Sequence, residues 1–139
     1  MGLVIYSSDD IIEFHIGYVG FSLIRTYFVL HYGKEAYDDY MKILRWTLCL
    51  SGDPCPVDVD EFERKVGDLT ILLTHSDCDG ELSSDECKRL RECLFVDEDR
   101  IRELHPNPEV TDMRIRTMHE FIKVIEYCAD RDDVKLLFG

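Results

Sequence analysis

The chain has 139 residues, 45% of them hydrophobic and 11% aromatic, and its 16 basic and 29 acidic residues give a net charge of −13. This length suits one domain with one core (residues 1–139), and the composition is that of a globular protein. A chain this acidic repels phosphate backbones and anionic lipids, which argues against nonspecific nucleic-acid binding and against membrane binding. A local pocket for a small anion is still compatible with this charge.

The start of the chain does not read as a secretion signal, because Asp9 and Asp10 follow a short apolar run that no basic residue precedes. No run approaches the roughly 18 apolar residues that a bilayer crossing needs. Six cysteines without a secretion signal are typical of a reducing compartment, where buried cysteine acts as a small hydrophobic residue. We therefore expect a cytoplasmic protein.

A short strand is expected first, over residues 2–8, and after a Ser-Asp-Asp turn residues 11–15 read as a second strand or a bridge. A helical period then begins at Gly20 and stops at Gly33, and a second helix follows over 34–50. The face of the first helix is formed by Phe21, Ile24, Phe28 and His31. The inward positions of the second are Tyr37, Tyr40, Leu44 and Leu48.

The clearest loop is SGDPCPVD, residues 51–58, with two prolines and a glycine. A third helix is expected from Asp58 or Asp60 to His75, where acidic residues suit the helix start. Its apolar positions are Phe62, Val66, Leu69 and Leu73. LTILLTH, residues 69–75, is also rich in β-formers and is compatible with a strand, but the unbroken 3.6-residue period favours helix.

A fourth helix, capped by Ser83 or Ser84, carries Cys87, Leu90 and Leu94 on one face. A short fifth helix covers residues 96–104, and a long last helix opens at Thr111 or Asp112. The inward side of the last helix is Met118, Phe121, Ile122, Ile125 and Cys128. Residues 132–139 read as a closing strand that pairs with LVIY. The predicted fold is mainly α (α+β), with about five or six helices and a small sheet of N- and C-terminal strands.

The run HSDCDGELSSDE, residues 75–86, resembles a single degenerate EF-hand loop, with Gly80 at the sixth position where the chain turns sharply. The chelating positions are filled by His75, Asp77, Asp79, the Glu81 carbonyl, Ser83 and Glu86. Carboxylate, hydroxyl and carbonyl oxygens are the ligands that Ca²⁺ prefers. The pattern departs at His75, where an EF-hand has aspartate, and in having no second loop. We predict a divalent-cation site here, with Ca²⁺ as the expected ion.

The same run also resembles the first motif of the DHH-type phosphoesterases, a strand that ends in His-x-Asp-x-Asp-Gly. That resemblance covers residues 69–83, requires LTILLTH to be a strand, and lacks the family's later Asp-His-His motif. It implies metal ligands at His75, Asp77 and Asp79 for manganese-assisted attack on a phosphodiester. Two other interpretations remain open: a plain turn with a helix cap, and a zinc site using His75 and Cys78.

Taken together, HIGYVGFSLIR and HSDCDG are similar to a loosely defined group of small uncharacterised proteins from bacteria, phages and large viruses. The shared positions are Gly17, Tyr18, Phe21, Arg25 and His75 to Gly80. The resemblance brings no established activity, but it is compatible with viral counter-defence by capture of a host protein or a nucleotide signal. Glycines before a helix with Arg25 would also suit a small anion, so Gly17, Tyr18 and Arg25 are candidate ligand-binding residues.

The function expected from these residues is a small acidic intracellular binding module that carries a cation loop. The loop supplies acceptors but no evident nucleophile–base pair, which favours binding over catalysis. Its expected partners are a protein or a small anionic ligand. A metal-dependent phosphoesterase is the alternative. The sequence does not indicate an oligomeric state.

Overall fold

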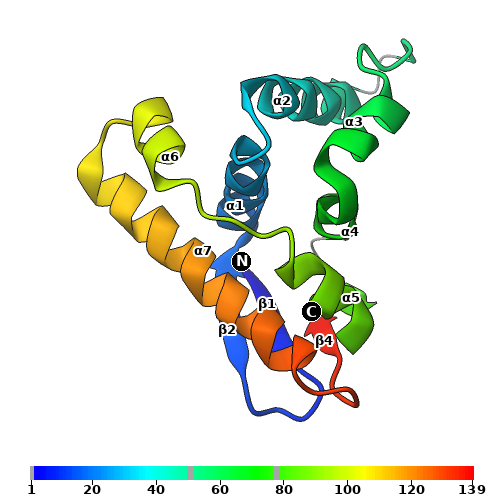
Figure 1. Cartoon of the computed structure of the whole chain (residues 1–139), viewed down its shortest axis with the longest axis vertical. Helices are drawn as coiled ribbons and strands as arrows, with labels where there is room; N and C mark the ends of the chain where they lie inside the picture. Colours follow the sequence, from blue (N-terminus) through cyan, green and yellow to red (C-terminus); the bar gives the residue numbers. More distant parts are fainter. Residues whose placement is uncertain (1, 50–51, 77–78) are drawn as a thin grey trace.

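In the computed structural model, which describes residues 2–49, 52–76 and 79–139, a four-stranded antiparallel sheet lies in the lower half of the view of Figure 1. The strands are β1 (Gly2–Ser7), β2 (Glu13–Gly17), β3 (Glu81–Leu82) and β4 (Leu136–Phe138). Their order is β2-β1-β4-β3, so strands from both ends of the chain meet in the centre of the sheet. The predicted sheet of N- and C-terminal strands is confirmed.

The register of β1 places its apolar side chains in the core. Ile5 is paired with Phe138 of β4 and with Phe14 of β2. Leu3 and Ile5 are buried while Val4 between them is half-buried, as the two-residue period of a strand requires. The two-residue strand β3, which pairs with β4, was not expected from the sequence.

The remaining elements are helical, which confirms the mainly α fold. They are α1 (Tyr18–Leu30), α2 (Lys34–Cys49), α3 (Val59–Val66), α4 (Thr70–Leu73), α5 (Ser84–Arg91), α6 (Glu98–Leu104) and α7 (Pro108–Ala129). In the part of the chain that the structure describes, no helix has both the length and the apolar composition for a membrane crossing.

The core centres on Phe121 of α7, which is fully buried. Its ring centroid lies 5.8 Å from that of Phe14 in β2, and 6.0 and 6.1 Å from those of Phe21 and Phe28 in α1. Aromatic rings at this spacing stabilise a core beyond the area that they bury. Every strand and helix adds at least one side chain to the same apolar cluster.

Within the ambiguous stretch 69–75, Thr70–Leu73 forms an α-helix, so the strand interpretation is wrong for these residues. Leu69 and Leu72 are buried three residues apart, which continues the helical period from Phe62. The predicted third helix is nevertheless divided, because Gly67 has φ 58° and a 3-10 turn, Gly67–Leu69, joins α3 to α4.

The last helix starts earlier than predicted, at Pro108. The Asn107 side chain accepts a hydrogen bond from the Glu109 amide at 3.2 Å, and proline follows at the first helical position. Proline suits this position because its missing N–H would have no partner within the helix. The HPNP segment therefore both ends α6 and begins α7.

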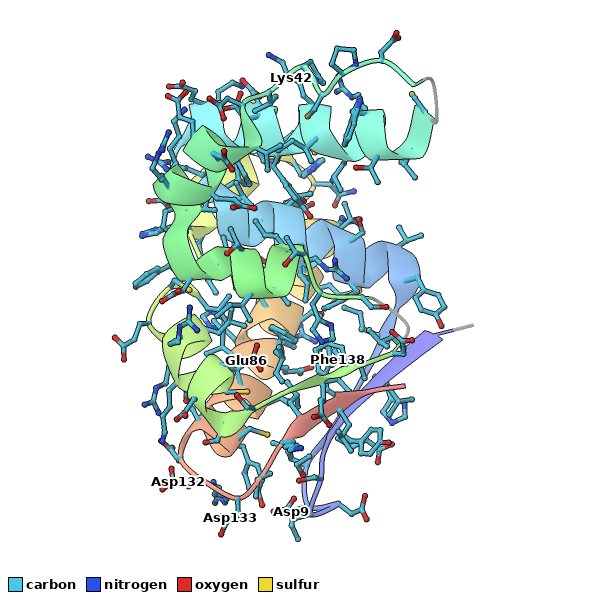
Figure 2. All side chains as sticks on the ribbon, turned by 90° about the vertical axis from the view of Figure 1, so that its right-hand side faces the viewer. Asp9, Lys42, Glu86, Asp132, Asp133 and Phe138 are labelled. Atoms are coloured by element: carbon cyan, nitrogen blue, oxygen red, sulfur yellow. The ribbon has the colours of Figure 1, made fainter. Side chains whose placement is uncertain are left out.

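The inward face predicted for α2 is only partly correct. Tyr40 is buried, Tyr37 and Leu44 are half-buried, and Leu48 is 80% exposed. All of residues 45–49 are exposed, because this end of α2 extends beyond the helices that cover its first turns (Figure 2). His31, placed on the face of α1, is likewise exposed beyond the end of that helix.

Candidate cation-binding loop

The candidate loop joins α4 to α5 and turns at Gly80, as predicted. Gly80 has φ 97°, a left-handed conformation that favours glycine. A Cβ added here would lie 3.2 and 3.3 Å from the Cε1 and Nε2 atoms of His75. Both the backbone and the space therefore require glycine at the sixth position.

The end of the loop forms a capping box at the start of α5. The Ser83 hydroxyl accepts a hydrogen bond from the Glu86 amide at 3.1 Å, and Glu86 Oε1 accepts one from the Ser83 amide at 3.0 Å. These two bonds satisfy amides that have no partner within the helix. The turn-and-cap interpretation is thus correct for Ser83, the ninth position of the predicted cation loop, and Glu86, the twelfth, completes the capping box.

His75, at the first position, lies against the sheet. Its ring centroid is 4.1 Å from that of Phe138. Its Nδ1 lies 2.7 Å from the Ser76 carbonyl oxygen and its Nε2 3.3 Å from that of Glu81. A neutral imidazole has one N–H, so it can donate to only one of these acceptors at a time. The ring therefore links the two arms of the loop in the tautomer that carries its proton on Nε2, which donates to the Glu81 carbonyl.

Arg25 links the loop to the helices behind it. Its Nη1 donates to the His75 carbonyl at 3.1 Å, and its guanidinium carbon lies 4.1 Å from the centroid of the Phe21 ring. Arg25 also lies close enough to the Tyr40 hydroxyl of α2 to act on it electrostatically. Burial raises the pKa of the Tyr40 hydroxyl, and the Arg25 guanidinium partly opposes this shift.

The structure therefore joins the two motifs, through the hydrogen bond from Arg25 to the His75 carbonyl. Gly17 and Tyr18 lie at the start of α1, with Gly17 as a cap that makes no side-chain hydrogen bond. Arg25 lies seven residues further on, or roughly 10 Å along a helix. Arg25 thus contacts the loop. Gly17 and Tyr18 lie two turns away from Arg25, at the N-terminal end of α1.

The other predicted ligands differ in their surroundings. The Glu81 carboxylate pairs with Lys135, with 3.1 Å between Oε1 and Nζ, while Asp79 is exposed. Asp77 and Cys78 lie outside the described residues. Within residues 2–49, 52–76 and 79–139, no three His, Cys, Asp or Glu side chains are grouped closely enough to hold a metal ion.

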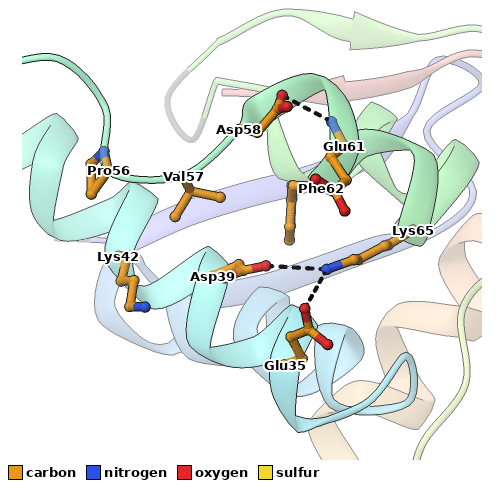
Figure 3. Close-up of a pocket in the computed structure, with 9 residues that line it drawn as sticks. All are labelled: Glu35, Asp39, Lys42, Pro56, Val57, Asp58, Glu61, Phe62 and Lys65. Atoms are coloured by element: carbon orange, nitrogen blue, oxygen red, sulfur yellow. Dashed lines mark hydrogen bonds and ion pairs between the residues drawn. The ribbon is translucent and has the colours of Figure 1, made fainter.

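A hollow of about 200 Å³ between α2 and α3 carries many charges that the sequence did not single out (Figure 3). Lys65 Nζ lies 2.8 Å from Glu35 Oε1 and 3.5 Å from Asp39 Oδ2. Hydrogen bonding to Lys65 lowers the pKa of Glu35 and raises that of Lys65. Asp58 accepts from the Glu61 amide as the cap of α3. We interpret this hollow as a joint between two helices.

The contacts of Arg25 and Phe138 with the loop could not be found from sequence spacing, because both residues are distant in the chain. The sequence feature that indicated proximity of Arg25 to the loop is the joint occurrence of the HIGYVGFSLIR and HSDCDG motifs in one chain. Comparison of the chain with protein-family models, curated proteins and solved structures finds no match.

Proposed function

We propose that this protein is a small non-enzymatic binding module whose 75–86 loop holds a divalent cation, with Ca²⁺ as the preferred ion. The position of Glu86 supports this most directly. Glu86 is the third residue of α5, and its carboxylate turns back toward the loop to accept from the Ser83 amide. A carboxylate at the twelfth position must point this way to reach a cation held by the loop.

The capping box and the cation would use the same carboxylate. Without an ion, Glu86 satisfies the Ser83 amide, and an ion would draw its oxygens toward the loop centre. The exchange would rotate the Glu86 side chain, and Gly80 already makes the sharp turn that a cation loop needs. Asp77, Asp79 and the Glu81 carbonyl would supply the other oxygens, with His75 as the variable first position.

An ion in this loop would act on more than α5. Arg25 holds the His75 carbonyl from α1, and the Phe138 amide of β4 donates to the Gly80 carbonyl at 3.0 Å. Through these contacts the ion would fix α1, α5 and the sheet relative to one another. The module would then present a protein-binding surface or a small-anion site in a cytoplasmic setting, and capture of a host protein or nucleotide signal is the role that the resemblance to viral proteins suggests.

The test is calorimetric titration with Ca²⁺, Mg²⁺, Mn²⁺ and Zn²⁺, each taken to millimolar concentration, on the wild type and on Glu86→Gln. Glutamine still completes a capping box but lacks the charge that a Ca²⁺ ligand supplies. We therefore expect Glu86→Gln to keep the Tm measured in EDTA and to weaken Ca²⁺ binding at least about tenfold, a loss of roughly 1.4 kcal/mol.

Glu109→Gln is the matched control, because Glu109 also lies in the first turn of a helix, far along the chain from the loop. It should leave Ca²⁺ binding unchanged. The proposal fails if none of the four ions releases heat or shifts the Tm of the wild type. It also fails if the control and Glu86→Gln weaken binding equally.

The phosphoesterase alternative loses its supporting strand, because Thr70–Leu73 is a helix. Its decisive measurement is turnover of a generic phosphodiester with Mn²⁺. Turnover by the wild type that disappears in Asp77→Ala would show that the protein is a phosphoesterase and would contradict the proposed binding module.

A further inference from the structure

The outer side of α2 carries an apolar stripe that the rest of the described chain leaves partly uncovered. Its members are Tyr37, Met41, Leu44 and Leu48, which recur at the spacing of a helix face. The first three are half-buried and Leu48 is 80% exposed. Tyr37 and Leu44 pack against the core on one edge, so the stripe borders the buried side of α2 and is partly open to a partner.

The opposite side of α2 is already occupied. Asp39 pairs with Lys65 of α3, and the Trp46 indole donates to the Asp53 carbonyl at 2.7 Å. Figure 3 shows Asp39 on this side, with its carboxylate pointing toward Lys65 of α3. The stripe is turned away from that joint, because Met41 and Leu44 lie about 100° or more around the helix from Asp39 and Trp46.

The charges of α2 are divided between its two halves. The first half carries Glu35, Asp38 and Asp39 besides Lys34, and the charged residues of the second half are Lys42 and Arg45. The helix dipole favours acidic residues in the first turn only, which accounts for Glu35 but not for the others. A helix with this arrangement is complementary to a second copy of itself running in the opposite direction.

Asp38 and Arg45 border the stripe, two turns apart on the same side of the helix. Neither forms an ion pair within residues 2–49, 52–76 and 79–139. Both lie close enough to the Tyr37 hydroxyl to act on it. Burial and Asp38 raise the pKa of Tyr37, whereas Arg45 lowers it. Asp38 and Arg45 are therefore available at the edge of the apolar stripe to pair with charges of a partner.

We propose that α2 is a self-association surface, on which α2 of a second copy packs antiparallel across a two-fold axis. In heptad terms Met41 and Leu48 occupy a positions, Tyr37 and Leu44 occupy d positions, and Asp38 and Arg45 occupy e positions. Antiparallel pairing sets Tyr37 against Leu48 of the second copy and Met41 against its Leu44. The two-fold axis then generates each of these two contacts a second time.

The same register brings Asp38 of each copy to Arg45 of the other, so the two ion pairs form reciprocally. It also directs the exposed Leu48 of one copy to the hollow of about 280 Å³ beside Tyr37 of the other. That hollow is lined by Leu30, Lys34, Tyr37, Arg100, Glu103 and Leu104. In this isologous interface, Leu48 of each copy would therefore fill the hollow beside Tyr37 of the other copy.

The contact is short, since the 16 residues of α2 span roughly 24 Å. Interfaces of this kind bury little area and give weak, concentration-dependent dimers. Repulsion between two chains of charge −13 also acts against association at low salt. At about 0.15 M salt the screening length is roughly 8 Å, which weakens that repulsion and leaves the touching pairs in place.

Sedimentation velocity on the full chain, from micromolar to millimolar concentration, tests the proposal. We expect a dimer in the wild type and loss of the dimer in Leu48→Lys. Met113→Lys is the matched control, because Met113 is exposed on α7 and distant from α2. It should dimerise as the wild type does, and circular dichroism should show that both variants are folded.

Charge reversal tests the direction of pairing. Asp38→Arg places like charges opposite Arg45 and should raise the dissociation constant about tenfold. The double variant Asp38→Arg with Arg45→Asp exchanges the charges and should restore it to the wild-type value. A monomeric wild type at millimolar concentration, equal behaviour of Leu48→Lys and Met113→Lys, or no rescue in the double variant would each overturn the proposal.

Discussion

Helices α7 and α2 both show a clear apolar period in the sequence, yet the chain covers one and leaves the other partly bare. In α7 eight residues are buried, among them Met118, Phe121 and Cys128. In α2 only Ala36 and Tyr40 are buried. The difference teaches that periodicity shows which side of a helix is apolar, but not what covers that side.

The largest difference between α7 and α2 is expected in the free energy of unfolding that is lost when an apolar side chain is truncated to alanine. Phe121→Ala should lower the free energy of unfolding by about 3–5 kcal/mol, because it opens a cavity among three aromatic rings. Leu48→Ala on α2 should change it by less than about 0.5 kcal/mol, since its side chain is mostly in solvent. Urea denaturation of the two variants at one low protein concentration measures both values. Similar losses would show that α2 is as well covered as α7.

Cysteine labelling compares the two helices without mutation. Cys49 is exposed at the end of α2, whereas Cys128 of α7 is buried beside Cys87. Hydrogen bonding to Cys128 together with burial raises the pKa of the Cys87 thiol. We expect a maleimide to label Cys49 at least about a hundredfold faster than Cys128, because Cys128 reacts only after local opening.

Mass spectrometry of the labelled peptides over time gives both rates. Labelling in urea is the control, since unfolding should bring the two rates together. Equal rates in native buffer would contradict the comparison.

The smallest difference is expected in the stability that is lost when the N-cap of α5, beside α7, or the N-cap of α3, beside α2, is removed. Ser83→Ala removes one half of the reciprocal capping box of α5, which packs on α7, and should cost about 1 kcal/mol. Asp58→Ala removes the single cap of α3, which packs on α2, and should cost about 0.5 kcal/mol. Thermal unfolding measured in EDTA compares them without an added ion. A larger effect from Asp58 would reverse the expected order.

The sequence predicted the mainly α fold, the sheet of terminal strands and the stop at Gly33, because these depend on local periods and turn residues. It did not predict the break at Gly67 or the strand β3. A glycine inside a helical period does not show whether its backbone will turn left-handed. A two-residue strand has no period of its own, and β3 exists because β4 lies beside it.

For the loop, the sequence predicted the turn at Gly80 and the capping role of Ser83, which follow from local residue chemistry. It could not predict that Arg25 would hold the His75 carbonyl, or that Phe138 would lie against the His75 ring. Those contacts are set by the packing of α1 and β4. Spacing within residues 75–86 contains no information about either element.

The pairing of β1 with β4 sets the order in which the fold can be completed during synthesis. Ile5 is made first, yet its partner Phe138 leaves the ribosome only after the 132 residues between them. At about 5–20 residues per second the β1–β2 hairpin must wait on the order of 10 s with Leu3 and Ile5 uncovered on one side. A chain stalled before β4 should therefore depend on chaperones, and the last strand decides when the protein escapes that dependence.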